Sequence, residues 1–171
     1  MRDGMKFHVG DPVVHWTYGL GHVVGIEERI ISNKNTLYYA ISAHDLTVWV
    51  PADNQLETRL RPPTAPKDFR RLFSILTGAG EPLPEDRQER RLILIEKLKV
   101  GQAKALCHVI RDLASYEQVH PLNDNDHVVM KRSCDTLLGE WSFVLSVPMV
   151  EAESELRRML ATGKSGASKK P

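Results

Sequence analysis

The feature that most constrains this chain is a change in hydrophobic period on either side of a proline-rich stretch, residues 59–67 (RLRPPTAPK). Before it, apolar and polar residues alternate, so that Val48 and Val50 share one face of a predicted strand and Trp49 takes the other. After it, apolar residues recur at the spacing of amphipathic helices. Because prolines cannot continue a sheet, the sequence predicts two domains of different class, joined by a linker.

The first domain, residues 1–60, is predicted to be a Tudor- or SH3-like β-barrel of four or five short, strongly bent strands. Turn signals separate the strands at Gly19 and at residues 32–35 (SNKN), and Pro51 ends the last clear strand. The run 19–25 (GLGHVVG) superficially resembles a dinucleotide-binding loop, but its spacing differs and a strand-like alternation follows it. We therefore interpret its glycines as positions that need unusual backbone angles.

The second domain, residues 67–162, is predicted to be an all-α bundle, with residues 61–66 as the linker and 163–171 as a disordered tail. The overall class is thus α+β with two domains. The clearest amphipathic segment places apolar side chains along one side of a helix at Leu106, Val109, Ile110, Leu113 and Ala114. The other predicted helices are residues 67–77, a helix beginning after Glu85 and carrying Leu92, Ile95 and Leu98, residues 123–147, and a last helix opened by Pro148.

Composition excludes several classes of function. The formal net charge of +1 argues against a protein that coats nucleic acid indiscriminately. No apolar run reaches the roughly 18–20 residues needed to span a bilayer, and the first residues lack a secretion signal. Cys107 and Cys134 are far apart and lie in helical patterns, so we interpret them as small buried residues in a reducing cytoplasm. The expectation is a cytoplasmic protein with no membrane partner.

Residues suited to catalysis or metal binding form no recognisable pattern. The histidines of the β domain have no ligand spacing and no supporting cysteine or paired carboxylate (His8, His15, His22 and His44). There is no GxSxG nucleophile motif, and the acidic residues are scattered or occupy helix starts. We therefore expect no enzymatic activity, no metal and no cofactor.

The basic residues are more informative. Between residues 67 and 111 there are ten basic and six acidic side chains, a local net charge of +4, and Arg87, Arg90 and Arg91 fall within five positions. A solvent-exposed charged face is the simplest interpretation, and a phosphate-contacting patch is the alternative. Trp49 also has two interpretations, because it points away from the apolar face of its strand. It either packs against the linker or helices, or it is exposed as an interface anchor.

A series of short motifs covers most of residues 5–160 in the order and spacing of one family. They are residues 7–14 (FHVGDPVV), 18–27 (YGLGHVVGIE), 38–39 (YY), 46–51 (LTVWVP), 82–84 (PLP), 96–101 (EKLKVG) and 109–113 (VIRDL). On these motifs the chain resembles the CarD/CdnL family of bacterial transcription regulators. The first block also resembles the polymerase-interacting module of the transcription-repair coupling factor, and the helical half favours the stand-alone regulator.

The resemblance implies a division of labour between the domains. The Tudor-like domain is expected to bind the RNA polymerase β subunit, with Arg29, Trp49 and Pro51 at the contact positions. The helical domain is expected to reach promoter DNA at the upstream edge of the transcription bubble and to stabilise the open complex. Such a protein is expected to be a monomer when free and to associate with the nucleoid through polymerase.

One departure from the family pattern affects the expected DNA contact. Relatives typically carry a tryptophan wedge in a W-x-x-R pattern at the start of the second bundle helix, where this chain reads Arg87-x-x-Arg90. We therefore expect a charge-driven contact through Arg87, Arg90 and Arg91, with weaker stabilisation of the bubble. Three alternatives stay open: an adaptor whose helical domain binds another protein, a free-standing nucleic-acid reader, and an enzyme.

Overall fold

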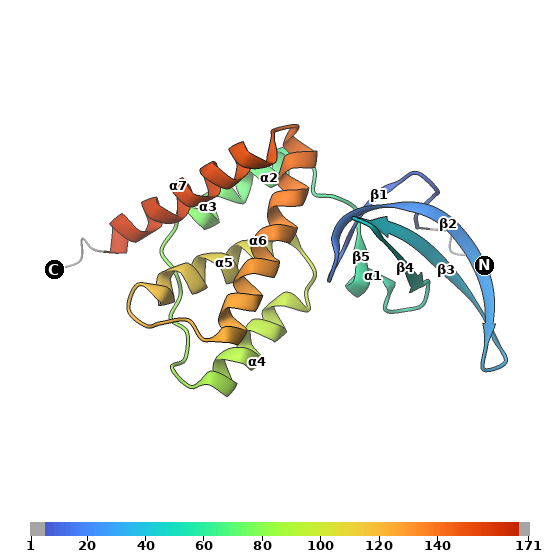
Figure 1. Cartoon of the computed structure of the whole chain (residues 1–171), viewed down its shortest axis with the longest axis horizontal. Coiled ribbons are helices and arrows are strands. Elements are labelled where there is room, and N and C mark those ends of the chain that lie inside the picture. Colours follow the sequence, from blue (N-terminus) through green and yellow to red (C-terminus); the bar gives the residue numbers. More distant parts are fainter. Residues whose placement is uncertain (1–5, 168–171) are drawn as a thin grey trace. The chain divides into compact units, whose positions relative to one another are not determined.

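The computed structural model describes residues 6–167, with side chains described for residues 6–163. The chain divides into two compact units, Met1–Pro63 and Thr64–Pro171, and the boundary between them falls within the linker predicted at 61–66. The first unit is a small sheet and the second is helical, which confirms the predicted class (Figure 1).

The first unit is a five-stranded antiparallel sheet in the order β4-β3-β2-β1-β5. Its strands are β1 (Pro12–His15), β2 (Gly19–Ile31), β3 (Lys34–Ala43), β4 (Leu46–Pro51) and β5 (Leu60–Arg61). This agrees with the predicted Tudor-like domain, although the sheet is not closed into a barrel, because β4 and β5 lie at opposite edges. Its core is formed by Phe7, Val13, Val23, Tyr39, Ile41, Val50, Leu56 and Leu60.

Two short elements complete the first unit, and the second of them passes the predicted boundary at residue 60. Helix α1 (Leu56–Arg59) follows β4, and β5 then pairs with β1, with Leu60 opposite His15 and Arg61 opposite Val14. Leu60 is fully buried, so its packing in the apolar core fixes β5 just before the prolines of the linker. The sequence predicted linker here because the segment is polar and short.

Of the glycines in the run 19–25, Gly19 has the unusual backbone angle that was predicted, whereas Gly21 and Gly25 do not. Gly19 has a positive φ of 75°, a conformation that costs glycine little. A side chain on Gly21 would place its Cβ 2.5 Å from the Ser42 carbonyl oxygen on the neighbouring strand. These glycines therefore serve backbone turning and close strand packing, and they precede strand, not helix.

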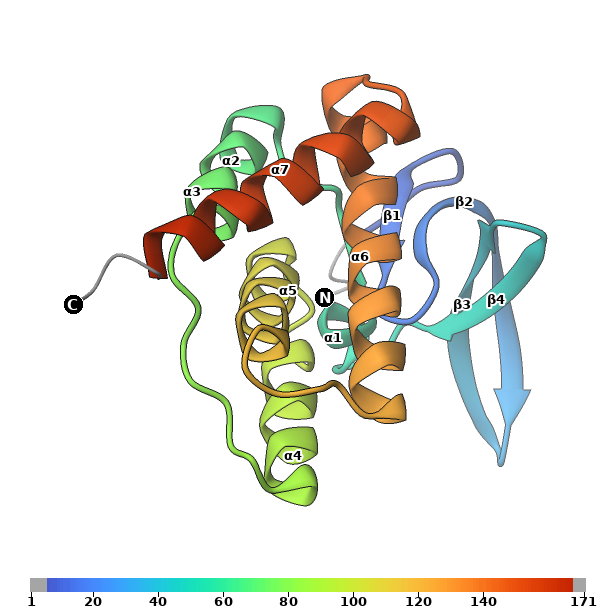
Figure 2. The ribbon, with the colours of Figure 1, turned by 60° about the vertical axis from the view of Figure 1, so that its left-hand side comes forward.

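The second unit contains α2 (Pro66–Arg71), α3 (Phe73–Leu76), α4 (Arg87–Leu98), α5 (Ala103–Glu117), α6 (Asp124–Leu145) and α7 (Met149–Ala167). Helix α5 lies in the middle of the bundle (Figure 2), and Val109, Ile110 and Leu113 are fully buried. One core joins α5 to α2, α3, α6 and α7, and a second joins it to α4 and the loop at Leu83. The apolar stripe predicted for α5 is confirmed.

Three details of the helical unit differ from the prediction. Residues 67–77 form two short helices, α2 and α3, in place of one. Helix α4 turns Leu92 and Ile95 outward, and its buried side chains are Arg90 and Leu94. Helix α7 continues to Ala167, so residues 163–167 are helical where a disordered tail was expected, and residues 168–171 lie outside the described part of the chain. Within the described residues, no helix has the length and apolar content of a membrane span.

Candidate functional site

The three residues expected at the first interface share one face of the sheet. Arg29 lies on β2, and Trp49 and Pro51 lie two positions apart on β4, with Pro51 opposite Tyr38 of β3. Since side chains alternate along a strand, this face is opposite to the one that buries Tyr39, Ile41 and Val50. We call the face that carries Arg29, Tyr38, Trp49 and Pro51 the outer face.

Arg29 and Trp49 are in direct contact on the outer face. The Arg29 guanidinium carbon lies 4.1 Å from the centroid of the Trp49 ring, which is the geometry of a cation–π pair. Both side chains stay accessible, at 44% for the Arg29 side chain and 36% for Trp49. Besides the ring, Arg29 contacts one acidic side chain among residues 6–163, the Glu27 carboxylate at 3.4 Å. The pair therefore presents an apolar ring and a cation together to a partner.

The second candidate site is the start of α4, where the three predicted arginines separate. Arg87 and Arg91 are exposed, and neither pairs with an acidic side chain among the described residues. Arg90 is 2% exposed, so it does not lie on the basic surface with the other two. This corrects the expectation that all three arginines face solvent.

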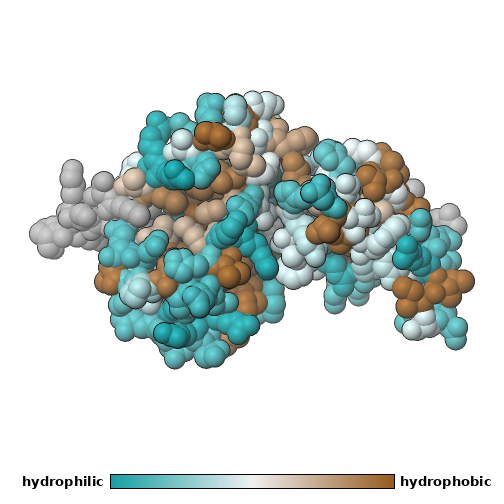
Figure 3. Space-filling view, in the orientation of Figure 1, coloured by the Kyte–Doolittle hydropathy of each residue, from teal (hydrophilic) through white to brown (hydrophobic). Residues whose placement is uncertain are grey.

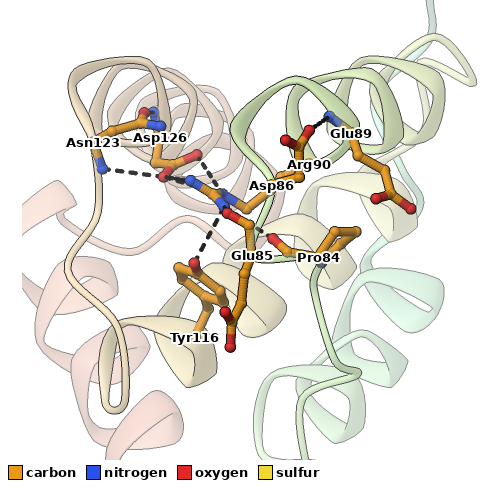
Figure 4. Close-up of polar contacts among 8 residues, drawn as sticks. All are labelled: Pro84, Glu85, Asp86, Glu89, Arg90, Tyr116, Asn123 and Asp126. Atoms are coloured by element: carbon orange, nitrogen blue, oxygen red, sulfur yellow. Dashed lines mark hydrogen bonds and ion pairs between the residues drawn. The ribbon is translucent and has the colours of Figure 1, made fainter.

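The Arg90 guanidinium donates hydrogen bonds to groups inside the protein (Figure 4). Nε donates to Asp126 Oδ1 at 3.1 Å and Nη2 donates to Asp126 Oδ2 at 2.9 Å, which makes a bidentate pair. Nη1 donates to the carbonyl oxygens of Pro84 and Glu85 and to the Tyr116 hydroxyl. Its bond to the Asp126 carboxylate raises the pKa of Arg90, so the buried side chain stays charged.

Asp126 is itself fixed by the start of α6. Its carboxylate accepts from the backbone N–H of Asn123, while the Asn123 side chain accepts from the backbone N–H of Asp126, forming a capping box. Arg90 therefore joins the 82–84 loop, the end of α5 through Tyr116 and the start of α6. Asp86 caps α4 by accepting from the Glu89 N–H at 2.8 Å. The first turn of α4 is held in one orientation by these bonds.

A second buried carboxylate holds the other end of α4. Asp112 on α5 is fully buried and accepts from Lys97 at 3.0 Å, from Arg111 Nε at 3.0 Å and from the Glu81 backbone N–H at 2.9 Å. Leu94, between the two clusters, is also fully buried. Because Arg90 and Lys97 both bind carboxylates inside the helical unit, these contacts fix which side of α4 faces solvent.

Five of the exposed residues of α4 form a strip along one side of the helix, and the exposed Glu89 and Glu96 lie beside that strip. The five follow helical spacing and include two arginines, an amide and two aliphatic side chains: Arg87, Gln88, Arg91, Leu92 and Ile95. We call this set the α4 strip. It contains no acidic residue, and Leu92 is 63% exposed. The arrangement can contact phosphates through its cations and apolar surface through its aliphatic residues.

The sequence did not predict that Leu92 and Ile95 are exposed, or that Arg90 forms a buried cluster. One signal was present: Arg90, Leu94 and Leu98 are spaced four residues apart, which marks them as one side of a helix. The capping-box spacing of Asn123 and Asp126 also placed a carboxylate at a helix start. Neither signal identifies the arginine as the buried partner, because arginine is rarely buried unless paired.

The remaining reactive side chains have structural surroundings. Burial raises the pKa of the Cys107 thiol to about 12 and that of Cys134 to about 11, so both stay protonated at neutral pH. His15 is buried, and its Nδ1 accepts from the backbone N–H groups of Thr17 and Tyr18. Across residues 6–163, no three histidine, cysteine or acidic side chains gather as metal ligands would.

Comparison with known proteins matches each unit separately. Residues 7–63 match the CarD-like/TRCF RID domain, and residues 71–157 match the CarD C-terminal domain. The chain is also 23% identical over 150 residues to a Bacillus subtilis (strain 168) protein named "Putative transcription factor YdeB". That match covers 86% of this chain and 98% of the relative. The order of the two matched domains is the order of the sheet and helical units.

Proposed function

Because this chain belongs to the CarD family of transcription regulators, we propose that it binds the RNA polymerase β subunit and contacts promoter DNA near the upstream bubble edge, modulating open-complex stability. The outer face of the sheet is the polymerase contact in this proposal, and the α4 strip is the DNA contact. The protein then acts in the cytoplasm as a monomer when free, and it reaches the nucleoid through polymerase.

The observation that carries the proposal is the grouping of Arg29, Trp49 and Pro51 on one accessible face of the unit that matches the RID domain. Tryptophan and arginine are the residues that most often dominate binding energy at protein interfaces. β4 is also an edge strand, so Trp49 and Pro51 lie beside backbone that pairs on one side only. A partner can therefore contact both the ring and the strand edge.

The DNA contact rests on Arg87 and Arg91. Both are exposed and free of acidic partners in the described part of the chain, and the buried bonds of Arg90 fix the helix turn between them. A few phosphate contacts give weak, salt-sensitive binding by themselves. Docking on polymerase raises the effective concentration of the helical unit at the DNA, so weak contacts suffice. Only contacts that are stronger in the open complex than in the closed one shift that equilibrium.

A binding assay tests the polymerase contact. The full chain is applied to immobilised β subunit at low salt, beside the variants Trp49→Ala and Arg29→Glu. We expect Trp49→Ala to weaken binding by about 2 kcal/mol or more, as for a buried interface tryptophan. Wild-type protein that fails to bind polymerase at low salt contradicts the proposal.

Footprinting tests the DNA contact on a polymerase–promoter complex. Arg87→Ala and Arg91→Ala are expected to weaken protection at the upstream fork, and each is expected to reduce the salt dependence of binding by about one ion. Arg157→Ala is the matched control, because Arg157 is an exposed arginine on α7 that pairs with Glu153. An equal effect of the control variant removes the assignment to α4.

A second candidate function is an adaptor whose helical unit binds another protein instead of DNA. The exposed Leu92 and Ile95 favour it, because aliphatic side chains beside arginines also suit a protein surface. In that case Leu92→Ala weakens regulation while the fork footprint of Arg87→Ala equals that of wild type. The footprint therefore separates the two functions.

A further inference from the structure

The connection between the two units is short because both of its ends are anchored. At one end, β5 ends at Arg61, which pairs with β1 in the sheet. At the other end, the backbone N–H of Thr64, the first residue of the helical unit, donates to the Glu140 carboxylate at 2.8 Å. The two residues between these anchors are both prolines, Pro62 and Pro63. We call this pair the proline joint.

Glu140 is a rigid anchor because it lies inside α6 and is 0% exposed. Leu137 and Trp141, beside it on α6, belong to the core that α6 shares with α2, α3, α5 and α7. A buried carboxylate needs hydrogen-bond donors, and the Thr64 N–H is one of them. The carboxylate also lies close to α5, where burial and then the charge of Glu140 raise the pKa of the Cys107 thiol to about 12. The start of the helical unit is thus fastened to its interior.

The proline joint has few backbone conformations open to it. The pyrrolidine rings fix the φ of both prolines at about −65°, and each proline also restricts the ψ of the residue before it, which is Arg61 or Pro62. The φ of Thr64 lies beyond its N–H, so the bond to Glu140 places that rotation inside the helical unit. Between residues 61 and 64, the ψ of Pro63 is therefore the one backbone rotation that is neither fixed nor restricted.

The two units depend on this connection because each has a core of its own. Among the described residues, the core of the sheet and the two cores of the helical unit share no residue. Hydrophilic side chains also cover much of the visible surface of the helical unit (Figure 3). Domains with separate cores move relative to each other by default, so the linker sets how large that motion is. A linker with one free rotation leaves little of it.

We propose that Glu140 and the proline joint make the connection between the units stiff, so that docking of the sheet unit on polymerase confines the α4 strip to a small region of the promoter DNA. The role in transcription rests on the proposed function, whereas the stiffness is a property of the free protein. A stiff connection loses little conformational entropy when both contacts form, and it keeps the effective concentration of the helical unit at the DNA high. Glu140 is thus a positioning residue, which acts from the interior without touching either partner.

Backbone nitrogen relaxation of the free full-length protein tests the stiffness, because it gives a rotational correlation time for each unit. In the wild type we expect the two units to have equal correlation times. Pro63→Gly frees the φ of residue 63 and the ψ of Pro62, so the correlation time of the smaller sheet unit is expected to fall below that of the helical unit. Pro66→Gly is the matched control, because Pro66 is the first residue of α2 and lies beyond the Thr64 anchor. It is expected to leave the two times equal.

Hydrogen exchange of the Thr64 amide tests the anchor directly. Glu140→Gln keeps the size of the side chain and removes its charge, which replaces a charge-assisted hydrogen bond by a neutral one. We expect the Thr64 amide to exchange about fivefold faster, the usual difference between these two kinds of bond. Glu117→Gln is the control, because it removes the same charge from an exposed residue at the end of α5. If the buried glutamine unfolds the helical unit, Pro63→Gly still tests the joint, since it leaves Glu140 and its bond in place.

The consequence for transcription is measured by comparing docking with positioning. Pro63→Gly and Pro66→Gly are tested in the β-subunit binding assay and in the footprint of the promoter complex at saturating protein. We expect both variants to bind the β subunit as wild type does, because neither proline is part of the outer face. At the upstream fork, Pro63→Gly is expected to lose protection while Pro66→Gly keeps it. A purely structural role for Pro63 would lower both readouts or neither.

Four outcomes would overturn all or part of this proposal. Unequal correlation times in the wild type mean that the joint is flexible, whatever polymerase does. Equal times in Pro63→Gly mean that something other than the joint couples the units. Normal fork protection by Pro63→Gly, with unequal correlation times, leaves a stiff joint without a positioning role. If the wild type fails to bind polymerase, the proposed function and the positioning role fail together, while the relaxation measurements still decide the stiffness.

Discussion

Two arginines of this protein lie over aromatic rings, and their surroundings differ completely. Arg29 stacks on Trp49 at 4.1 Å on the surface of the sheet, and Arg90 lies 4.7 Å from the ring of Tyr116 inside the helical unit. Arg90 donates to Asp126 and to two carbonyl oxygens, while Arg29 donates to Glu27 alone among the described side chains. An arginine over a ring is therefore no indication of function by itself. What distinguishes the two is whether donors remain for a partner.

This difference predicts that removing the acidic partner of each arginine lowers stability by unequal amounts. A buried guanidinium that loses its carboxylate has no water to replace it, whereas an exposed guanidinium is already hydrated. Substitutions around Arg90 should therefore mainly lower the stability of the helical unit and change binding only indirectly. Substitution of Arg29 should mainly weaken binding and change stability little. Four measurements test this contrast, beginning with the largest expected change.

Asp126→Asn is expected to lower the free energy of unfolding by about 3–5 kcal/mol, because it leaves the buried Arg90 charge without its partner. Urea unfolding followed by circular dichroism measures this. Asp135→Asn is the control, since it is the same substitution on the same helix but breaks only the exposed pair with Lys131. Equal midpoints for the two variants would contradict a structural role for Arg90.

Tyr116→Phe removes one acceptor of Arg90 and keeps the ring. We expect a loss of about 0.5–1.5 kcal/mol in stability, the usual contribution of one hydrogen bond. In the Asp126→Asn background the loss should differ, because both side chains bind the same guanidinium. Strict additivity of the two substitutions would show that the cluster does not act as a unit.

Arg29→Met is expected to change the stability of the sheet unit by less than about 1 kcal/mol, because the cation–π pair it breaks is exposed to solvent. The same variant is expected to weaken polymerase binding. Tryptophan fluorescence during urea unfolding gives the first value and the β-subunit assay the second. A stability loss as large as that of Asp126→Asn would mean that the outer face is built for folding instead of binding.

His15 extends the contrast to a buried base without a carboxylate. Burial lowers the pKa of His15, and its neutral Nδ1 accepts from the Thr17 and Tyr18 N–H groups. The unfolded chain therefore binds a proton more readily, so stability is full above the ordinary histidine pKa of about 6.5 and declines as pH falls through it. His15→Asn keeps an acceptor without titrating, so its stability should fall less between pH 7 and 5. An identical decline in both proteins would exclude His15 as the cause.

Much of this architecture follows from the sequence alone. The change of period at residues 59–67 determined the two units, because strands and helices bury apolar residues at different spacings. The alternation in residues 46–50 determined that Trp49 faces away from the core, and the structure shows it partly exposed. The apolar stripe of α5 was predicted from spacing because that helix is buried along most of one side.

The tertiary structure alone decided the orientation of α4 and which of its arginines is buried. The sequence of this helix offers two rival apolar sides, one with Leu92 and Ile95 and one with Leu94 and Leu98. The choice between them depends on Asp126, which lies 36 residues away and offers the charge that makes burial of Arg90 favourable. Local spacing cannot encode a partner so distant in the chain. Physical contact between α4 and α6 therefore settled which arginines stay exposed.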